Sequence, residues 1–238
     1  MKLSALNLDF KELNAQVRAA KGDVRISNCC GQRFIASGLD ERTITIEGTP
    51  GNALGAYLDG AVIEVKGNVQ DAVGDTMNGG KIIVHGNAGD ALGYAMRGGS
   101  IFIRGDAGYR TGIHMKQYID KKPSIIVGGS VGSFLGEYLA GGLIIVLGMD
   151  AHKIPVGNFT GTGMHGGKIF IRTEQEITDL PAQVTAEIAP EADLQEITPL
   201  LFEFSDYFHH DAEKLLTDRF YVLKPNAKNP YKQLYVIN

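Results

Sequence analysis

Isoleucine recurs along this chain at a nearly constant interval, and glycine recurs with it. Most of the intervals between successive marker isoleucines are nineteen residues, and two are longer by five or six. The isoleucines are Ile44, Ile63, Ile82, Ile101, Ile125, Ile144 and Ile169. The glycines that keep the same phase are Gly55, Gly74, Gly93, Gly112 and Gly136. A fixed period of this length is typical of stacked structural repeats, so it constrains the fold before any other feature.

Each repeat is too short to hold a helix between two strands. One unit reads GNVQDAVGDTMNGGKIIVHG, with a turn, a short apolar step, a glycine pair and a run rich in Ile and Val. A strand–helix–strand crossover takes about 30 residues, whereas nineteen extended residues suffice for one coil of a solenoid. The sequence therefore predicts an all-β, right-handed parallel β-helix with about 19 residues per coil and about seven to eight coils.

Three columns of equivalent residues are expected to be structural. Glycine pairs occupy one corner of successive coils: Gly79 and Gly80, Gly98 and Gly99, Gly141 and Gly142, Gly166 and Gly167. Glycine adopts a positive φ at little cost, so these pairs and the glycines in phase with isoleucine are predicted to turn the chain. A second column, Asn68, Asn87, Asp106 and Ser130, is predicted to satisfy backbone groups at a bend. A third, Met77, Met96 and Met115, is predicted to form an internal apolar ladder.

The repeat divides the chain into three parts. Residues 1–23 are predicted to cap the first coil, residues 24–172 to form the β-helix, and residues 173–238 to form a small, mostly helical extension. Within the extension, Leu194, Ile197, Leu201, Phe204 and Phe208 suit one face of a helix, which Pro199 is expected to kink or split. Residues 219–223 are expected to form a final strand.

Composition excludes several classes of function. The net charge of -4 argues against nucleic-acid binding, and no apolar run approaches the roughly 20 residues that span a membrane. Residues 1–10 lack the pattern of a signal peptide, and the adjacent Cys29 and Cys30 do not make a disulfide framework, so a cytoplasmic setting is expected.

No residue of this chain is predicted to be catalytic, to bind a cofactor or to bind a metal. His114, His152 and His165 are too scattered to match a metal-ligand spacing, and Cys29 with Cys30 is interpreted as a buried thiol pair whose role stays open. The glycine turns lack the following helix that a dinucleotide fingerprint requires.

Two insertions interrupt the period and are candidate interaction loops. The first reads IHMKQYIDKKPS and follows Gly112, and the second reads MDAHKIPVGNFTGTG and follows Gly148. Inserted loops on a rigid scaffold commonly carry binding surfaces. The residues proposed for a partner interface are Lys116, Tyr118, Lys121, Lys122, His152 and Lys153.

Several stretches together resemble a known family. They read GTPGNALGAYLDGA, GNVQDAVGDTMNGGKIIVHG, GDALGYAMRGGSIFIRG, GYRTGIHMK, GEYLAGGLIIVLG and GTGMHGGKIFIR. The chain resembles the GXGXG domain at the C-terminus of the glutamate synthase alpha subunit, and more closely the free-standing, domain 3-type version of it. The resemblance implies a right-handed parallel β-helix with a structural role in glutamate biosynthesis and ammonia assimilation.

The resemblance also implies partners. They are a glutamine amidotransferase subunit and an FMN/iron–sulfur glutamate synthase subunit, which hold the FMN and the iron–sulfur cluster, while this chain holds no cofactor. Lys2, not a cysteine, follows Met1, and the chain has no cluster-type set of cysteines, so the chain alone is expected to lack these chemistries. A homo-oligomer stays open.

Other repeats of this kind provide alternative hypotheses. The equivalent GXGXG polypeptides of formylmethanofuran dehydrogenase and of N-methylglutamate synthase share the repeat. A β-helix carbohydrate-active enzyme fits less well, because a nineteen-residue period does not divide into the hexapeptides of sugar acyltransferases. The leading hypothesis is therefore a non-catalytic scaffold subunit of a glutamate synthase-type oxidoreductase complex.

Overall fold

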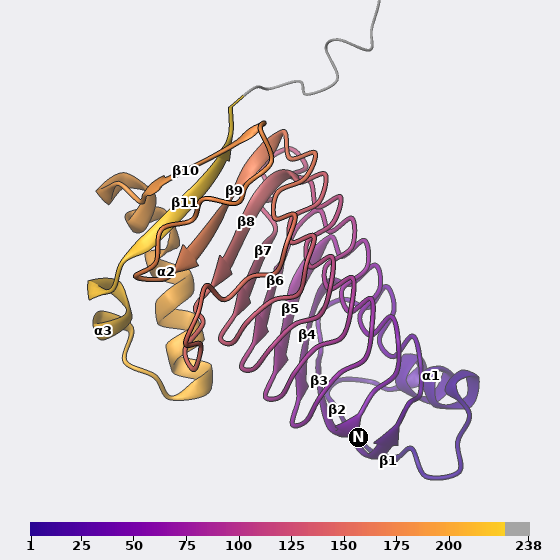
Figure 1. Ribbon diagram of the computed structural model, residues 1–238. Coiled ribbons are helices and arrows are strands. Elements are labelled where there is room, and N and C mark those ends of the chain that lie inside the picture. The colour runs from indigo at the N-terminus through magenta and orange to yellow at the C-terminus, as the bar shows by residue number, and fades with distance from the viewer. Residues whose placement is uncertain (227–238) are drawn as a thin grey trace, which may run out of the picture.

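A single sheet runs along one side of a stack of coils. The computed structural model describes residues 1–226, which contain eleven strands in the order β1-β2-β3-β4-β5-β6-β7-β8-β9-β11-β10 (Figure 1). Eight coils each contribute one parallel strand: β2 (Val24–Cys30), β3 (Thr43–Thr49), β4 (Asp59–Val65), β5 (Gly79–Val84), β6 (Ser100–Ile103), β7 (Ser124–Val127), β8 (Ala140–Val146) and β9 (Gly166–Arg172). The predicted parallel β-solenoid is confirmed.

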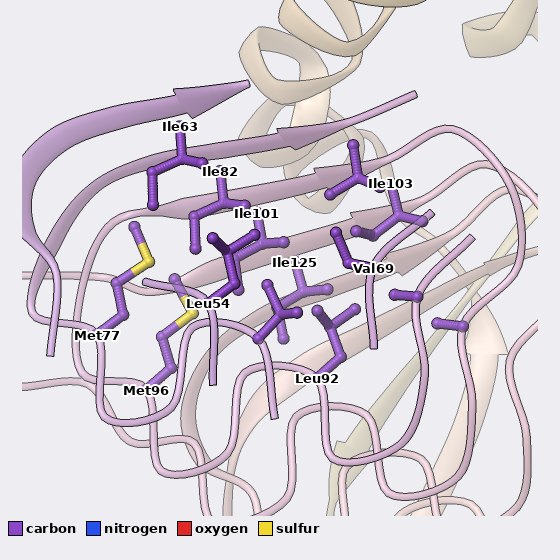
Figure 2. Packing of buried hydrophobic residues seen from close by; sticks show 14 of the residues in the cluster. Leu54, Ile63, Val69, Met77, Ile82, Leu92, Met96, Ile101, Ile103 and Ile125 are labelled. Carbon is purple, nitrogen blue, oxygen red and sulfur yellow. The ribbon is translucent and has the colours of Figure 1, made fainter. Parts of the chain in front are cut away.

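The isoleucine period sets the register of the sheet. Ile63 pairs with Ile44 on one side and with Ile82 on the other, and Ile101 pairs with Ile125. These side chains point into the coils and stack in columns (Figure 2). The predicted methionine ladder is confirmed, because Met77, Met96 and Met115 are fully buried in the same core.

The face opposite the sheet contains turns instead of strands. Three residues per coil adopt a positive φ, as at Ala53 (61°), Gly55 (65°) and Tyr57 (58°), and they alternate with residues of ordinary φ. The N–H of Ala53 donates to the oxygen of Asp71 in the next coil, whereas the N–H of Gly55 donates to the oxygen of Ile35 in the preceding coil. Alternating φ therefore lets this face hydrogen-bond to both neighbouring coils without β-structure.

The in-phase glycines are needed because isoleucine fills the space beside them. Their φ angles are all positive: Gly55 65°, Gly74 69°, Gly93 66°, Gly112 71° and Gly136 64°. A Cβ on Gly93 would lie 2.4 Å from Cδ1 of Ile125. The glycine and isoleucine periods coincide because each corner glycine leaves room for an inward isoleucine.

The glycine pairs answer two separate demands. The second member has a positive φ, as in Gly80 (89°). The first member is crowded by the preceding coil, since a Cβ on Gly98 would lie 2.5 Å from the backbone oxygen of Asn78. The second member is crowded too, since a Cβ on Gly80 would lie 2.2 Å from the backbone oxygen of Ala61. A larger residue would therefore clash at either position and would also be strained at the second.

The predicted side-chain ladder is also confirmed. Asn68 Oδ1 accepts from the N–H of Asn87 at 2.8 Å, Asn87 Oδ1 accepts from Asp106 at 2.8 Å, and Asp106 Oδ1 accepts from Ser130 at 2.7 Å. Asp71 Oδ1 accepts from the N–H of Asp90 in the same way at 2.9 Å. Each coil thus satisfies a turn N–H of the next coil.

Short elements cover the N-terminal end of the stack. β1 (Lys2–Ser4) pairs in parallel with β2, and α1 (Phe10–Ala19) begins at Asp9 with a capping box. Leu13 and Val17 are the buried face of α1.

The C-terminal extension adds two strands and two helices. β10 (Val184–Ile188) precedes α2 (Glu191–Phe208), α3 (Ala212–Thr217) and β11 (Phe220–Pro225). β11 lies antiparallel between β9 and β10, so the predicted final strand is confirmed, while its partner β10 was not predicted.

Helix α2 runs through Pro199, so the structure shows no split at this residue. Pro199 is exposed, whereas Ile197 and Leu201 on either side of it are fully buried. Packing of the helix therefore outweighs the backbone hydrogen bond that proline removes.

Helix α2 covers the outer face of the sheet at the later coils (Figure 1). Its inner side presents Ile197, Leu201, Phe204 and Phe208. The strands present Ile83, Phe102, Ile126, Ile145 and Phe170. The sheet is therefore sandwiched between the core inside the coils and a second core under α2. None of the helices in residues 1–226 meets the length and hydropathy expected of a membrane span.

Candidate interaction surfaces

The side chains that could take part in catalysis or metal binding do not lie together at one site. Within residues 1–226 no cluster of three or more His, Cys, Asp or Glu side chains has the arrangement of a metal site. His114 stacks on Tyr138, His165 lies beside the oxygen of Gly163, and His152 is exposed on the second inserted loop. The three histidines named in the sequence therefore have three different environments.

The two cysteines differ in exposure. Cys30 is exposed, whereas Cys29 is buried and its Sγ lies 3.4 Å from Oε1 of Gln32. Burial raises the pKa of the Cys29 thiol to about 11. A thiol with so high a pKa is a poor nucleophile near neutral pH. Only Cys29 fits the interpretation of a buried thiol.

The first inserted loop is divided between exposure and internal contacts. Lys116 and Tyr118 are exposed, and Lys121 Nζ lies 3.2 Å from Oδ1 of Asp59. Lys122 is bound to Glu196 of α2. Lys122 therefore fastens this loop to the extension. Its contact with a partner stays a prediction.

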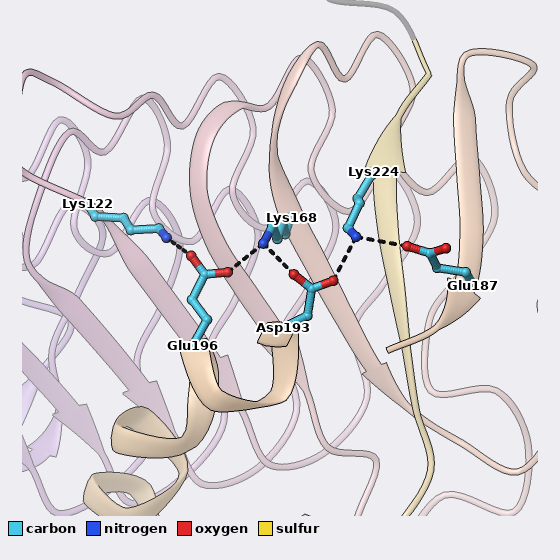
Figure 3. Close-up of polar contacts among 6 residues, drawn as sticks. All are labelled: Lys122, Lys168, Glu187, Asp193, Glu196 and Lys224. Atoms are coloured by element: carbon cyan, nitrogen blue, oxygen red, sulfur yellow. Dashed lines mark hydrogen bonds and ion pairs between the residues drawn. The ribbon is translucent and has the colours of Figure 1, made fainter. Parts of the chain in front are cut away.

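That contact is the first link of an ionic chain along the sheet (Figure 3). Lys168 of β9 lies 2.7 Å from Glu196 and 2.5 Å from Asp193. Lys224 of β11 lies 2.7 Å from Asp193 and 2.8 Å from Glu187 of β10. Five separate segments of the chain are thus joined by alternating charges. We call the six residues Lys122, Lys168, Glu187, Asp193, Glu196 and Lys224 the ionic chain.

Two carboxylates of the ionic chain, Asp193 and Glu196, stay charged in spite of partial burial. Burial alone would raise the pKa of Asp193, but the hydrogen bonds and charges of Lys168 and Lys224 outweigh it and lower the pKa below its ordinary value. The pKa of Glu196 is lowered in the same way by Lys122 and Lys168. Opposite charges at this distance favour the ionised form of both partners. The arrangement suits a structural clasp, since every charge is already paired.

The second inserted loop borders a polar cleft of about 350 Å³. His152 and Lys153 lie on one side of the cleft, and Arg172, Asp218 and Arg219 lie on the other. Arg172 Nε donates to Oδ2 of Asp218 at 2.6 Å and its Nη1 donates to the oxygen of Leu147 at 2.8 Å. The loop is thus placed against the extension, and the predicted His152 and Lys153 share one surface.

An exposed aromatic column was not predicted. The rings of His114 and Tyr138 stack with centroids 5.0 Å apart, and the ring of Tyr94 meets His114 edge-on at 5.9 Å. His114 and Tyr138 occupy equivalent positive-φ positions on the turn face. His114 and Tyr138 each stand two residues after an in-phase glycine, and this shared spacing indicated that their rings would lie side by side.

A family model matches the whole repeat region and most of the extension. The model described as "GXGXG motif" matches residues 9–228. The chain belongs to the GXGXG motif family. Uncharacterized protein MJ1350 of Methanocaldococcus jannaschii is 40% identical to this GXGXG protein over 249 aligned positions, covering 98% of this chain and 95% of that protein.

A solved structure shares the GXGXG fold. It is the X-ray crystal structure of the formyltransferase/hydrolase complex (FhcABCD) from Methylorubrum extorquens in complex with methylofuran. One of its chains superimposes with a TM-score of 0.61 and 19% identity, covering 92% of this chain and 89% of that chain. At this identity the likeness establishes a common fold.

Proposed function

We propose that this GXGXG protein is a non-catalytic scaffold subunit of a multisubunit enzyme complex that acts on formyl groups, of the formyltransferase/hydrolase type. The observation that carries the proposal is the match of 92% of the chain to 89% of one chain of such a complex. Nearly the whole molecule, including its extension, therefore corresponds to a polypeptide that works beside other subunits. This proposal follows the alternative hypothesis from the sequence more closely than the glutamate synthase hypothesis.

The placement of polar groups supports a scaffold. The Asn and Asp side chains of the ladder bond to backbone N–H groups of the next coil, and the most buried carboxylate, Asp193, is held by two lysines. A catalytic acid or base generally needs a proton-transfer partner at an open position and a pKa near the working pH. The ionic chain instead lowers carboxylate pKa values and raises those of Lys168 and Lys224.

Glutamate synthase is the second candidate, and the sequence motifs favour it. The stretches from GTPGNALGAYLDGA to GTGMHGGKIFIR resemble the domain that separates the amidotransferase and synthase parts of that enzyme. On this hypothesis FMN and an iron–sulfur cluster belong to a partner subunit and this chain holds neither. The two candidates share a scaffold role and differ in the partners that assemble on it.

The test is purification of the tagged full-length chain from its native host, with identification of stoichiometric partners by mass spectrometry. We expect subunits of a formyltransferase/hydrolase complex and transfer or hydrolysis of formyl groups by the assembly. Flavin absorbance and glutamine-dependent glutamate formation would support the second candidate instead.

The isolated chain provides the control. It should catalyse neither formyl transfer nor glutamine hydrolysis. Turnover by the purified chain alone, or a chain that purifies from its host without any stoichiometric partner, would contradict the scaffold role.

A further inference from the structure

Two cations stack on the outside of successive coils. The N–H of Arg97 donates to the oxygen of Met77, and the N–H of Lys116 makes the equivalent bond to Met96 one coil later. Both side chains are exposed, and within residues 1–226 neither forms an ion pair, unlike the neighbouring Lys121. The backbones of successive coils lie about 4.8 Å apart, and like charges at equivalent positions of neighbouring strands destabilise each other.

The coil itself does not require cations at this position. The equivalent backbone bond is made by Asp59, Asn78, Ala140 and His165 in other coils. These residues include an acid, an amide and a methyl group, so the fold accepts very different side chains here. The pair of cations is therefore a feature of these two coils, and its self-repulsion calls for a compensating charge.

A third cation, Lys121, lies next to the pair and is itself paired with Asp59. Cβ of Lys121 lies 3.1 Å from the place where a Cβ on Gly98 would stand, directly after Arg97 in the chain. Tyr94 and His114, which precede Arg97 and Lys116 in their coils, contact each other, and Tyr118 is 55% exposed. We call this set the basic corner; it comprises Tyr94, Arg97, His114, Lys116, Tyr118 and Lys121.

We propose that the basic corner binds an acidic segment of a partner polypeptide. The proposal rests on the proposed scaffold function and names the chemistry of one partner. Carboxylates form the strongest hydrogen bonds with Arg and Lys, and Tyr with Arg is the composition enriched at protein interfaces. An acidic segment would neutralise the charges of Arg97 and Lys116, which form no ion pair within residues 1–226.

Two other occupants fit less well. A second copy of this chain, docked by two-fold symmetry, would place the basic corner against itself and bring like charges together. A nucleic acid needs a long basic stripe, whereas this chain has a net charge of -4. An acidic polypeptide is the occupant that charge complementarity favours.

The direct test treats the purified native assembly with a carbodiimide, which joins an amine to a carboxylate only when the two are in contact. We expect mass spectrometry to find Lys116 linked to an Asp or Glu of another subunit. Lys116→Arg keeps the charge and removes the amine, so it should abolish this link. Lys11, exposed on the N-terminal cap, is the control and should give no link to another subunit.

Charge reversal provides the second arm. Arg97→Glu with Lys116→Glu should lower retention of the partner at least about tenfold, while Lys11→Glu with Lys21→Glu makes the same change in net charge and should leave retention intact. Melting curves of the isolated variants would show whether both fold.

The outcomes separate this inference from the scaffold function. An intact assembly in which Lys116 links only within its own chain, or to a second copy, overturns the acidic-partner proposal and leaves the scaffold role standing. Equal loss of the partner in both double variants, or a partner that nuclease removes, would also overturn the acidic-partner proposal and leave the scaffold role standing. A chain that assembles with nothing overturns both.

Discussion

The early and late coils share one inner face and differ on the outer one. In β3 and β4 the inward Ile44, Ile46 and Ile63 are fully buried, while the outward Thr45 and Glu64 are only partly covered. In the late coils the outward residues are apolar and buried as well: Ile83, Phe102, Ile126, Ile145 and Phe170. Every coil of this solenoid needs apolar residues that point inward. The outward residues differ, because they are apolar only in the strands that the extension covers.

The same contrast applies to the polar groups. Around the early coils, side-chain bonds run between equivalent positions of neighbouring coils, as from Asn87 to Asn68. Around the late coils such bonds continue, as from Ser130 to Asp106, and others join distant segments, as from Lys168 of β9 to Asp193 of α2. Stability in the early half is therefore mainly a sum over neighbouring coils, and in the late half it also depends on the extension.

Gly93→Val should give the largest loss of stability, about 4 kcal/mol. It combines backbone strain of about 1–3 kcal/mol at positive φ with overpacking of about 1–3 kcal/mol against Ile125. Chemical denaturation of the full-length variant measures the change. Gly38→Val is the matched control, because Gly38 has the same φ of 66° and no atom within 4 Å of an added Cβ.

The difference between these two variants isolates crowding by isoleucine. Gly38→Val should lose only the backbone part. Equal losses in both variants would contradict the explanation that the glycine and isoleucine periods coincide for reasons of space.

Phe204→Ala should destabilise the late coils by about 3 kcal/mol, because it empties a fully buried position under α2. Hydrogen exchange should accelerate in α2 and in strands β5–β9 and stay unchanged in β2 and β3. Phe202→Ala, on the same helix but 44% exposed, should change exchange little. Faster exchange throughout the whole sheet would indicate that the two halves unfold as one unit.

Low pH should loosen the extension before the coils. The folded pKa values of Asp193 and Glu196 lie below their ordinary values of 3.8 and 4.5, so their stabilisation is complete above pH 4.5 and is lost as the pH falls through the folded values. Lys168 and Lys224 have raised pKa values, so their contribution is complete below pH 10.5 and is lost above it.

Asp193→Asn tests the assignment of this pH dependence. It should cost about 2 kcal/mol at neutral pH, because two charge-assisted contacts are lost, and it should flatten the stability profile below pH 4.5. Circular dichroism melting curves across this pH range provide the measurement. A profile with the same slope as the unmodified protein would exclude Asp193 as a source of acid sensitivity.

Asn87→Ala should have the smallest effect, about 1 kcal/mol, because the exposed N–H of Asp106 loses its side-chain acceptor and water replaces it in part. Gln70→Ala, an exposed neighbour, is the control. Both are compared by their melting midpoints. A change as large as that of Phe204→Ala would mean that the ladder is more than a local support.

The coil architecture was predictable because one period controls many residues at once. Ile63 and Ile82 fix the register, Gly74 fixes a corner, and Asn68 and Asn87 fix a ladder, all at a constant spacing. Each level of the sequence agrees with the others, as expected for a consistent repeat. The positive φ of residues such as Tyr57 and Phe134 was not predicted, since their side chains do not favour that conformation.

The sequence does indicate which strands α2 covers, although the regular spacing of isoleucine does not reveal it. The run TITIE in the third strand alternates between apolar and polar, whereas SIFI and LIIV in later strands are almost continuously apolar. Continuous apolar runs are typical of strands buried on both faces. The ionic chain could not be predicted in the same way, because Lys122, Lys168 and Lys224 share no period and meet their partners only through tertiary packing.

The central proposal is that this protein meets its partners at the basic corner and at the second inserted loop, and not on its early regular coils. Hydrogen exchange of the chain alone, compared with the same chain in its native assembly, tests this claim most directly. The account predicts that exchange slows at least about tenfold, or about 1.4 kcal/mol, in residues 94–124 and 149–163, and stays unchanged in residues 43–86. Protection that appears instead on the regular coils, with both inserted loops unchanged, would contradict it.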